Sequence, residues 1–347
     1  MKLRGKLAKA IVIATIGIMS VSTTFASDLP VLTLEQAISS ALSADAAQQE
    51  VYRAERAAST QVMQDTDDVA TVNYQSNYYS KLESEQTEKY HKDAVAYEAT
   101  KLYNAIPVLE KQVAFCDEKL AFQEKQFSQM EVKYRNGLVS KLDYETAEST
   151  IKEQRTAKEK LQAQLDESRE KFKLVAKYDT TKYSLEEHFD VEYYDYTGNI
   201  KYFFDSCVDD MLHYQKKLIE VSADYTVSDG IKRGDNSALT YYNNKSSVAS
   251  AKAGLESTKE SRISTLNSLY SSLATIKQNI KELEVSIQDK EKTLEANRLK
   301  FSKGLMSEIE ISKAELELKE AQLNLINYKV QYNATKDAVR KPWVNFY

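Results

Sequence analysis

The sequence predicts a mainly α-helical protein made of two tandem, long antiparallel coiled-coil hairpins, related by an internal pseudo-twofold repeat. Three observations support this fold class. The 347 residues include only 8 Gly and 3 Pro, and 29% of them are charged, a composition typical of long helices with few turns. Apolar residues recur every seven residues over long stretches. The same turn also occurs twice, at Gly137 and at Gly304.

Residues 1–26 are expected to form a secretory signal peptide. Basic residues from Lys2 to Lys9 precede an apolar segment over 10–21, and small residues favour cleavage after Ala26. The rest of the chain contains no run long and apolar enough for a transmembrane helix. We therefore expect an exported protein of the cell envelope, located in the outer membrane if the organism has one.

Charge and motifs exclude several classes of function. The net charge of −5 becomes −9 once the four basic residues of the signal peptide are removed, which argues against a nucleic-acid partner. The histidines His91, His188 and His213 lack metal-ligand spacing, and no phosphate loop or nucleophile motif occurs. The sequence thus predicts no enzyme activity, no catalytic residues, no cofactor and no metal site.

The heptad pattern occurs in two copies, related by the same offset that separates Gly137 from Gly304, which we call the repeat offset. Four apolar residues in the first copy, each seven residues from the next, have apolar equivalents in the second: Val113, Leu120, Phe127 and Tyr134 correspond to Ile280, Ile287, Leu294 and Phe301. Such stripes are typical of long helices that pack against each other. The two hairpins are expected to be roughly 60–80 Å long.

Cys116 lies on an alternate heptad position of the first copy. A small buried thiol is therefore the favoured interpretation. A disulfide with Cys207 is the alternative, because an exported protein can pair its cysteines.

The two repeated stretches "GLVS" and "GLMS" predict tight turns between antiparallel helices. A glycine suits the left-handed residue that ends a helix, and a serine three residues later suits the N-cap of the next helix. Glu310 completes a capping box with Ser307, and Asp143, whose side chain is shorter, lies at the equivalent position after Ser140. The turn residues are Gly137, Leu138, Val139 and Ser140 in the first copy, and Gly304, Leu305, Met306 and Ser307 in the second.

The remaining elements follow from local signals. A capping box of Thr33 and Gln36 predicts a helix that continues to about Asp65. Helical periodicity is lost over 68–79 and over 226–244, so both zones are expected to be irregular, and Pro107 is expected to kink its helix or mark its start. The expected boundaries are a first repeat over 27–178, a connector over 179–199 and a second repeat over 200–347.

Two adjacent tyrosines lie at the end of each irregular zone. They are at the end of the long helix that is farthest from its turn. They can form an aromatic belt at a membrane interface, or they can pack at a helix bend. The sequence leaves both interpretations open for these four side chains, which are Tyr78, Tyr79, Tyr241 and Tyr242.

The tandem hairpins, their Tyr/Phe-x-x-Gly-Leu turns and the N-terminal "LTLEQAI" resemble the TolC-like outer-membrane efflux family over nearly the whole mature chain. The resemblance implies a homotrimer whose twelve helices form a tunnel. Its hairpin tips would dock a periplasmic adaptor (membrane fusion) protein and an inner-membrane pump. Asp143 and Glu310 would then be either a tunnel constriction or helix caps. Lys313 occupies a second position that is acidic in some members.

The resemblance is incomplete at the end opposite the turns. A pair of membrane-spanning strands needs about 25 residues, and the first irregular zone has about a dozen, so the β-barrel portion is expected to be short or missing. Two functions of different classes follow. The first is a passive export duct of a tripartite efflux or secretion system. The alternative is a non-conducting coiled-coil scaffold of the cell envelope.

Overall fold

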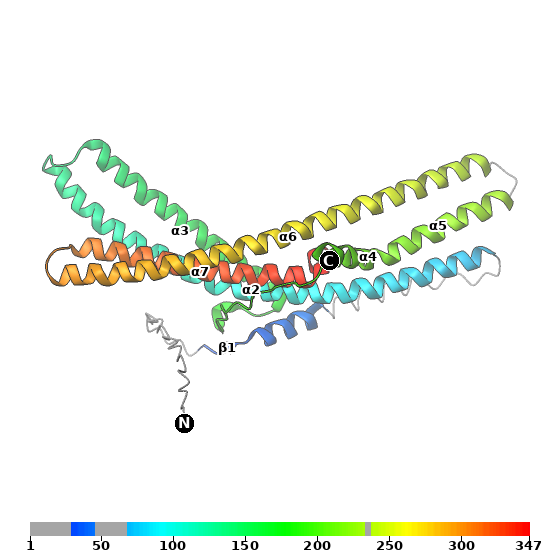
Figure 1. Cartoon of the computed structure of the whole chain (residues 1–347), viewed down its shortest axis with the longest axis horizontal. Helices are drawn as coiled ribbons and strands as arrows, with labels where there is room; N and C mark the ends of the chain where they lie inside the picture. Colours follow the sequence, from blue (N-terminus) through cyan, green and yellow to red (C-terminus); the bar gives the residue numbers. More distant parts are fainter. Residues whose placement is uncertain (1–28, 46–67, 233–236) are drawn as a thin grey trace, which may run out of the picture.

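The computed structural model describes residues 29–45, 68–232 and 237–347 (Figure 1). Four long helices dominate it: α2 (Asp68–Arg135), α3 (Lys141–Ala176), α6 (Ser237–Ser302) and α7 (Glu308–Arg340). The shorter elements are a helix over 34–45, α4 (Ile200–Met211), α5 (His213–Lys232), and the 3-10 turns η1 (Thr180–Lys182) and η2 (Pro342–Asn345). Two short strands, β1 (Val31–Leu32) and β2 (Ser184–Leu185), pair in parallel. The predicted mainly α fold class is confirmed.

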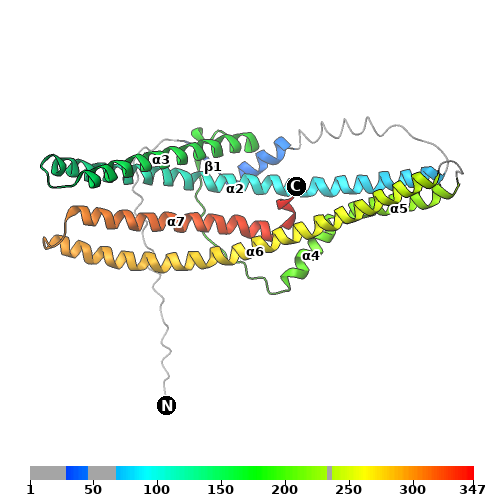
Figure 2. The ribbon, with the colours of Figure 1, turned by 90° about the horizontal axis from the view of Figure 1, so that it is seen from above.

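The long helices form two antiparallel hairpins, α2 with α3 and α6 with α7, as the sequence predicts. Figure 2 shows them as two layers, and Figures 1 and 2 both place the two turns at the same end of the molecule. The shorter arm of the first hairpin has 36 residues, so its paired part is about 54 Å long, below the predicted 60–80 Å. The long arms, α2 and α6, continue well beyond their partners.

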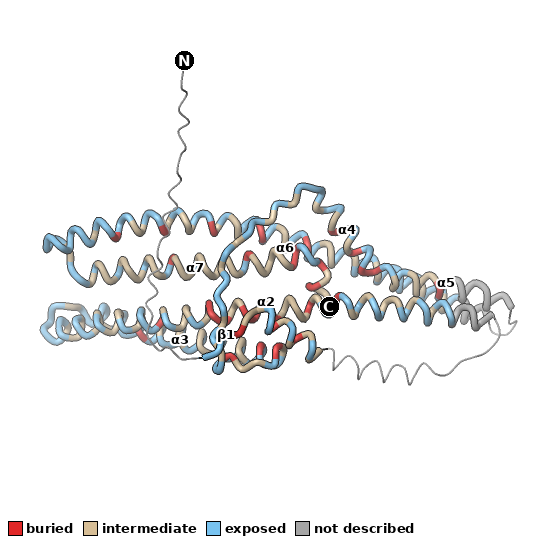
Figure 3. The backbone as a smooth tube through the Cα atoms, turned by 90° about the horizontal axis from the view of Figure 1, so that it is seen from below, coloured by how far each residue is buried: buried red, intermediate tan, exposed pale blue. Residues whose placement is uncertain are grey.

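The repeat extends from the turns into the core. Buried residues concentrate around the middle of the molecule, where the hairpins meet the shorter elements (Figure 3). There, pairs of side chains related by the repeat offset are almost fully buried. These pairs are Ala99 and Leu266, Ile106 and Leu273, Leu165 and Tyr332, and Phe172 and Val339. Each hairpin therefore buries the same face, and burial of these apolar surfaces is the main stabilising contribution.

The two zones predicted to be irregular are helical, which corrects that expectation. Residues 68–79 form the first turns of α2, and 226–244 belong to α5 and α6 apart from 233–236. At this end α5 packs against both α2 and α6, so tertiary contacts support helices that weak local periodicity does not indicate. The helix over 34–45 begins where predicted, with reciprocal Thr33 and Gln36 hydrogen bonds. Its predicted continuation to Asp65 lies outside the described residues.

Pro107 lies inside α2 and does not mark the start of the helix. Its ring lacks the N–H that would bond the carbonyl four residues earlier. Ile106 and Val108, on either side of it, are nearly fully buried, and this packing stabilises the helix across the missing bond. The prediction that Pro107 starts the helix is therefore wrong.

The chain between the repeats is anchored by two tyrosine hydroxyls. The Tyr103 hydroxyl donates to the Leu32 carbonyl at 2.6 Å and accepts from the Glu186 amide at 2.8 Å, which joins both strands to α2. The Tyr332 hydroxyl on α7 accepts from the Tyr194 amide at 2.9 Å. The connector thus bonds to the first repeat at one end and to the second repeat at the other.

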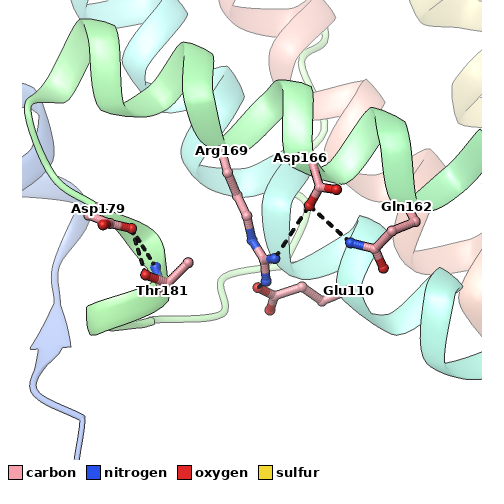
Figure 4. A network of polar contacts seen from close by, with 6 residues as sticks. All are labelled: Glu110, Gln162, Asp166, Arg169, Asp179 and Thr181. Carbon is pink, nitrogen blue, oxygen red and sulfur yellow. Dashed lines mark hydrogen bonds and ion pairs between the residues drawn. The ribbon is translucent and has the colours of Figure 1, made fainter.

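Ion pairs tie the two arms of the first hairpin together away from the turn. Figure 4 shows Arg169 of α3 beside Glu110 of α2 and Asp166 of its own helix, with Nη2–Oε1 and Nη1–Oδ1 distances of 2.7 Å and 3.8 Å. Gln162 donates to the same Asp166 carboxylate at 2.9 Å. These groups are partly exposed, so each pair contributes about 1 kcal/mol or less.

The C-terminal segment joins the repeats to each other. Asp93 of α2 accepts from Lys341 Nζ at 2.7 Å and from Trp343 Nε1 at 2.8 Å, and the Trp343 ring stacks on Tyr90 at 5.3 Å. The Tyr90 hydroxyl donates to Asp210 at 2.7 Å, and burial together with this carboxylate raises the pKa of Tyr90. Nothing in the local sequence pattern predicted this junction.

Both cysteines are free thiols, and Cys116 is buried as its heptad position predicts. Burial raises the pKa of both thiols. Within the described residues, no helix combines the length and the apolar character needed to cross a membrane. In the same parts of the chain, no three His, Cys, Asp or Glu side chains are grouped so that they could hold a metal ion.

Candidate docking surface at the hairpin turns

The first turn ends α2 with a Schellman motif. Gly137 has a φ of 69°, its amide donates to the Tyr134 carbonyl at 2.9 Å, and the Leu138 amide donates to the Lys133 carbonyl at 2.9 Å. These two bonds satisfy carbonyls that the end of a helix would otherwise leave unpaired. The left-handed backbone explains the glycine that interrupts an otherwise helical sequence.

The second turn repeats this geometry closely. Gly304 has a φ of 70°, its amide bonds the Phe301 carbonyl at 2.8 Å, and the Leu305 amide bonds the Lys300 carbonyl at 2.9 Å. A Cβ added to either glycine would find nothing within 4 Å, so the requirement for glycine comes from the backbone angle alone. The predicted turns are confirmed in position and in conformation.

The serines and carboxylates after the glycines act as helix caps. The Ser307 hydroxyl accepts from the Glu310 amide at 3.3 Å, and the Ser307 amide donates to the Glu310 carboxylate at 2.8 Å, a complete capping box. The Ser307 amide and the Ser307 hydroxyl both donate to the Glu310 carboxylate, each at 2.8 Å, and these two bonds hold the pKa of Glu310 below its usual value. Ser140 caps α3 through the Asp143 amide at 3.1 Å, and its hydroxyl donates to the Asp143 carboxylate at 2.7 Å.

The leucines at the turns project into solvent. Leu138 is 74% exposed and Leu305 is 75% exposed, whereas the next residues of the turns, Val139 and Met306, are partly buried. Exposed leucines at the tip of a hairpin contribute little to the stability of the chain. Their nearly equal exposure at equivalent positions makes the two turns a candidate docking surface.

One further exposed aliphatic residue lies beside each turn, and the sequence did not predict either of them. Val132 and Leu299 are 59% and 58% exposed, and each lies six residues before the exposed leucine of its turn. The signal that identifies them is that the repeat offset relates one to the other. We define the tip surface as Val132, Leu138, Leu299 and Leu305.

The paired tyrosines lie at the end of the molecule opposite the turns. Tyr78 is 49% exposed, Tyr242 is 65% exposed and Tyr79 is partly buried, while the side chain of Tyr241 lies outside the described residues. Tyr74, which the sequence interpretation did not select, is 71% exposed. The tyrosines lie near the starts of α2 and α6, at the end of the molecule opposite the two turns that join α2 to α3 and α6 to α7 (Figure 1).

A polar face runs along α6 between these ends. An open groove of about 870 Å³ lies between α4 and α6. The α6 side of the groove is rich in small hydroxyl and amide side chains, which include Ser264, Asn267, Ser268, Ser271, Ser272 and Thr275. The opposite face of the same helix buries the apolar stripe. Over 260–276, α6 therefore has a buried apolar face and an opposite face of mainly small polar side chains, which also includes Ile263 and Ile276.

Three comparisons with known proteins complete the description. No family model matches the chain, and a search of curated proteins finds no match. Among solved structures, it is similar to a membrane protein from Pseudomonas aeruginosa (12% identity, 79% of this chain and 72% of that chain, TM-score 0.56). It is also similar to the CmeC outer-membrane channel of Campylobacter jejuni (13% identity, 78% of this chain and 67% of that chain, TM-score 0.54). A third similar structure is the outer-membrane protein VceC of Vibrio cholerae (13% identity, 75% of this chain and 72% of that chain, TM-score 0.51).

These neighbours are membrane and channel proteins rather than enzymes. At identities of 10–13% the likeness concerns the fold, and it covers about three quarters of the chain. The chain therefore has the helical-hairpin fold of the TolC-like outer-membrane efflux channels.

Proposed function

We propose that this protein is a passive export duct of the cell envelope, located in the outer membrane where the organism has one. It would act in a tripartite efflux or secretion system, as a homotrimer that docks an adaptor protein and an inner-membrane pump through its hairpin turns. The observation that carries the proposal is the pair of equally exposed leucines, Leu138 and Leu305, at one end of a TolC-like fold.

Trimer formation is supported by the number and the faces of the helices. One chain supplies four hairpin helices, too few to enclose a water-filled lumen, whereas symmetric association of copies closes a ring. The face of mainly small polar side chains on α6 suits a helix that lines water. In such a ring Asp143 and Glu310 would lie near the narrow end, in addition to capping their helices.

Docking is supported by the chemistry of the turns. The backbone bonds of each turn lie within the chain, so the exposed leucines are free to enter an apolar groove on a partner. A carboxylate placed there would be buried without a partner, which is costly in an interface. The turns themselves would keep their hydrogen bonds, because those bonds use backbone groups.

The experiment replaces both leucines with aspartate and measures export in cells that lack the native protein. Leu138→Asp with Leu305→Asp should reduce efflux of a panel of fluorescent dyes to the level of the deletion strain. Leu174→Asp is the matched control, because Leu174 is also a leucine of the first hairpin, is 69% exposed and lies far from the turn. The control should keep normal efflux, and both proteins should melt like the wild type.

Two results would contradict the proposal. Normal efflux in the double variant would show that the leucines do not dock a partner. Images of the purified wild-type assembly without a hollow threefold tube would favour the alternative, a non-conducting coiled-coil scaffold of the envelope.

A further inference from the structure

The end of the molecule opposite the turns carries exposed aromatic rings on α2. Tyr74 and Tyr78 are 71% and 49% exposed, and they lie one helical turn apart near the start of the helix. Their ring centroids are 6.5 Å apart and their planes differ by 13°, so the rings are nearly parallel. Tyr79 packs edge-on against Tyr78 at 5.4 Å. We call Tyr74 and Tyr78 the tyrosine platform.

The segments of α2 and α6 at this end of the molecule are uncharged, whereas α5, which packs against both helices, carries charged residues. No Asp, Glu, Lys or Arg occurs over 69–80 of α2 or over 236–244 around the start of α6, although 29% of the chain is charged. Figure 1 places the starts of α2 and α6 at the same end of the molecule. On α5, Lys217 lies close enough to Tyr79 to interact with it, and its charge is paired with Glu220 at 2.9 Å.

The residues between and beside the rings are mainly Gln, Asn and Ser. These side chains both donate and accept hydrogen bonds without carrying a charge. The exposed ring faces therefore lie next to neutral hydrogen-bonding groups.

This chemistry fits a sugar polymer better than a lipid surface. Membrane-surface helices bury a broad apolar face, usually with Trp, Phe or Leu, and carry Lys or Arg on the other side. The segment from Tyr74 to Ser80 contains no aliphatic side chain and no charge, and the aliphatic residues of this end of α2, Val69, Ala70 and Val72, all precede the platform. A sugar ring has a flat C–H face that packs on an aromatic ring, and its hydroxyl and acetamido groups match the amides of Asn and Gln.

We propose that the tyrosine platform binds an uncharged, β-linked amino-sugar polysaccharide, the chemistry of a cell-wall glycan strand. Tyr74 and Tyr78 would each pack against one sugar face, and the neighbouring amides would bond its substituents. Such binding would fix the end of the protein opposite the turns within the envelope. It uses residues separate from the tip surface and does not depend on the export function proposed above.

The test measures retention of the purified mature chain on insoluble, fully acetylated chitin. The wild type should be retained, and the double variant Tyr74→Ala with Tyr78→Ala should bind at least about 10-fold more weakly, since two aromatic contacts are lost. The double variant to Phe keeps both rings and should retain most of the binding. Tyr202→Ala is the matched control, because Tyr202 is 74% exposed on α4, away from the platform.

Four outcomes would overturn the proposal. They are no retention of the wild type, equal retention of the alanine double variant, loss of binding in the phenylalanine variant, or binding to phospholipid vesicles but not to chitin. A change of oligomeric state in the alanine variant, measured by light scattering, would assign the platform to contacts between copies instead. Because both side chains are exposed, the variants should keep the helical circular dichroism and melting temperature of the wild type.

Discussion

The two hairpins have the same turn but differ in the residues around it. In the second turn, Glu310 reaches back to the Ser307 amide, whereas Asp143 in the first turn bonds only the Ser140 hydroxyl. The first turn compensates with aromatic packing, since Tyr144 stacks on Tyr134 at 4.7 Å. The equivalent residues in the second hairpin are Ile311 and Phe301.

This difference separates what the turn requires from what can vary. The glycine with positive φ and the two Schellman bonds are common to both copies, so they fix the chain reversal. The two turns differ in the side chain that carries the capping carboxylate and in the packing beside it, so both combinations support the same chain reversal. The exposed leucine is common to both copies although no bond of the turn needs its side chain, which is why we propose that a partner contacts it.

The largest effect is expected in the shared core. Phe172 and Val339 are equivalent residues, and both are fully buried. Phe172→Ala should lower the free energy of unfolding by about 3–5 kcal/mol because it leaves a large cavity, and Val339→Ala should cost less because fewer atoms are removed. Urea titration followed by circular dichroism measures both.

Leu174→Ala is the control for the core substitution, since Leu174 lies two residues from Phe172 but is 69% exposed. It should change the free energy of unfolding by no more than about 0.5 kcal/mol. A loss at Leu174 as large as that at Phe172 would contradict the assignment of the buried face.

An intermediate effect is expected at the two glycines of the turns. Gly137→Ala and Gly304→Ala should each cost about 1–2 kcal/mol, because a side chain in the left-handed region clashes with its own backbone. The two costs should be similar, since neither new Cβ meets another group. Gly254→Ala, inside α6 and also in open space, should stabilise the protein by about 0.5–1 kcal/mol. Clearly unequal costs at the two turns would contradict their equivalence.

The smallest effect is the pH dependence of the second cap. The pKa of Glu310 is lowered in the folded state by its bonds with Ser307, so this carboxylate favours folding at pH values above its unfolded pKa of about 4.3. That contribution should disappear as the pH falls through the lowered folded pKa. Glu310→Gln keeps an acceptor but cannot titrate, so its melting temperature should lie below that of the wild type at pH 7 and approach it near pH 3. A constant difference over this range would refute the role of the charge.

Local features of the sequence were sufficient to predict the turns and the buried stripes. The glycine, the serine cap and the carboxylate lie within seven residues of one another, and their hydrogen bonds stay within that segment or the adjoining helix end. The stripe residues Ile280, Ile287 and Leu294 are buried, as their seven-residue spacing predicts, whereas Phe301 is exposed. Their equivalents in the first copy are only partly buried: Val113, Leu120, Phe127 and Tyr134. The repeat then located both turns without any structural information.

The errors came from segments whose structure depends on distant residues. The tyrosine-rich run over 68–79 has no apolar stripe, so the sequence predicts it to be irregular, yet it is helical and α2 packs against α5. Helix propensity is a weak guide in such a run because packing overrides it. Tyr74 was missed for the same reason, since its exposure follows from the helix that the sequence did not predict.

The sequence by itself determined the helical hairpins, because glycine conformation, capping and heptad spacing act between residues close in the chain. Only the tertiary structure decided how the two repeats are joined. Lys319 of α7 pairs with Glu118 of α2, and Asp93 of α2 holds Trp343 near the end of the chain. The repeated heptad pattern gives the two hairpins similar helix faces, so it does not specify which faces pack together. The packing of the whole chain determines which side chains meet.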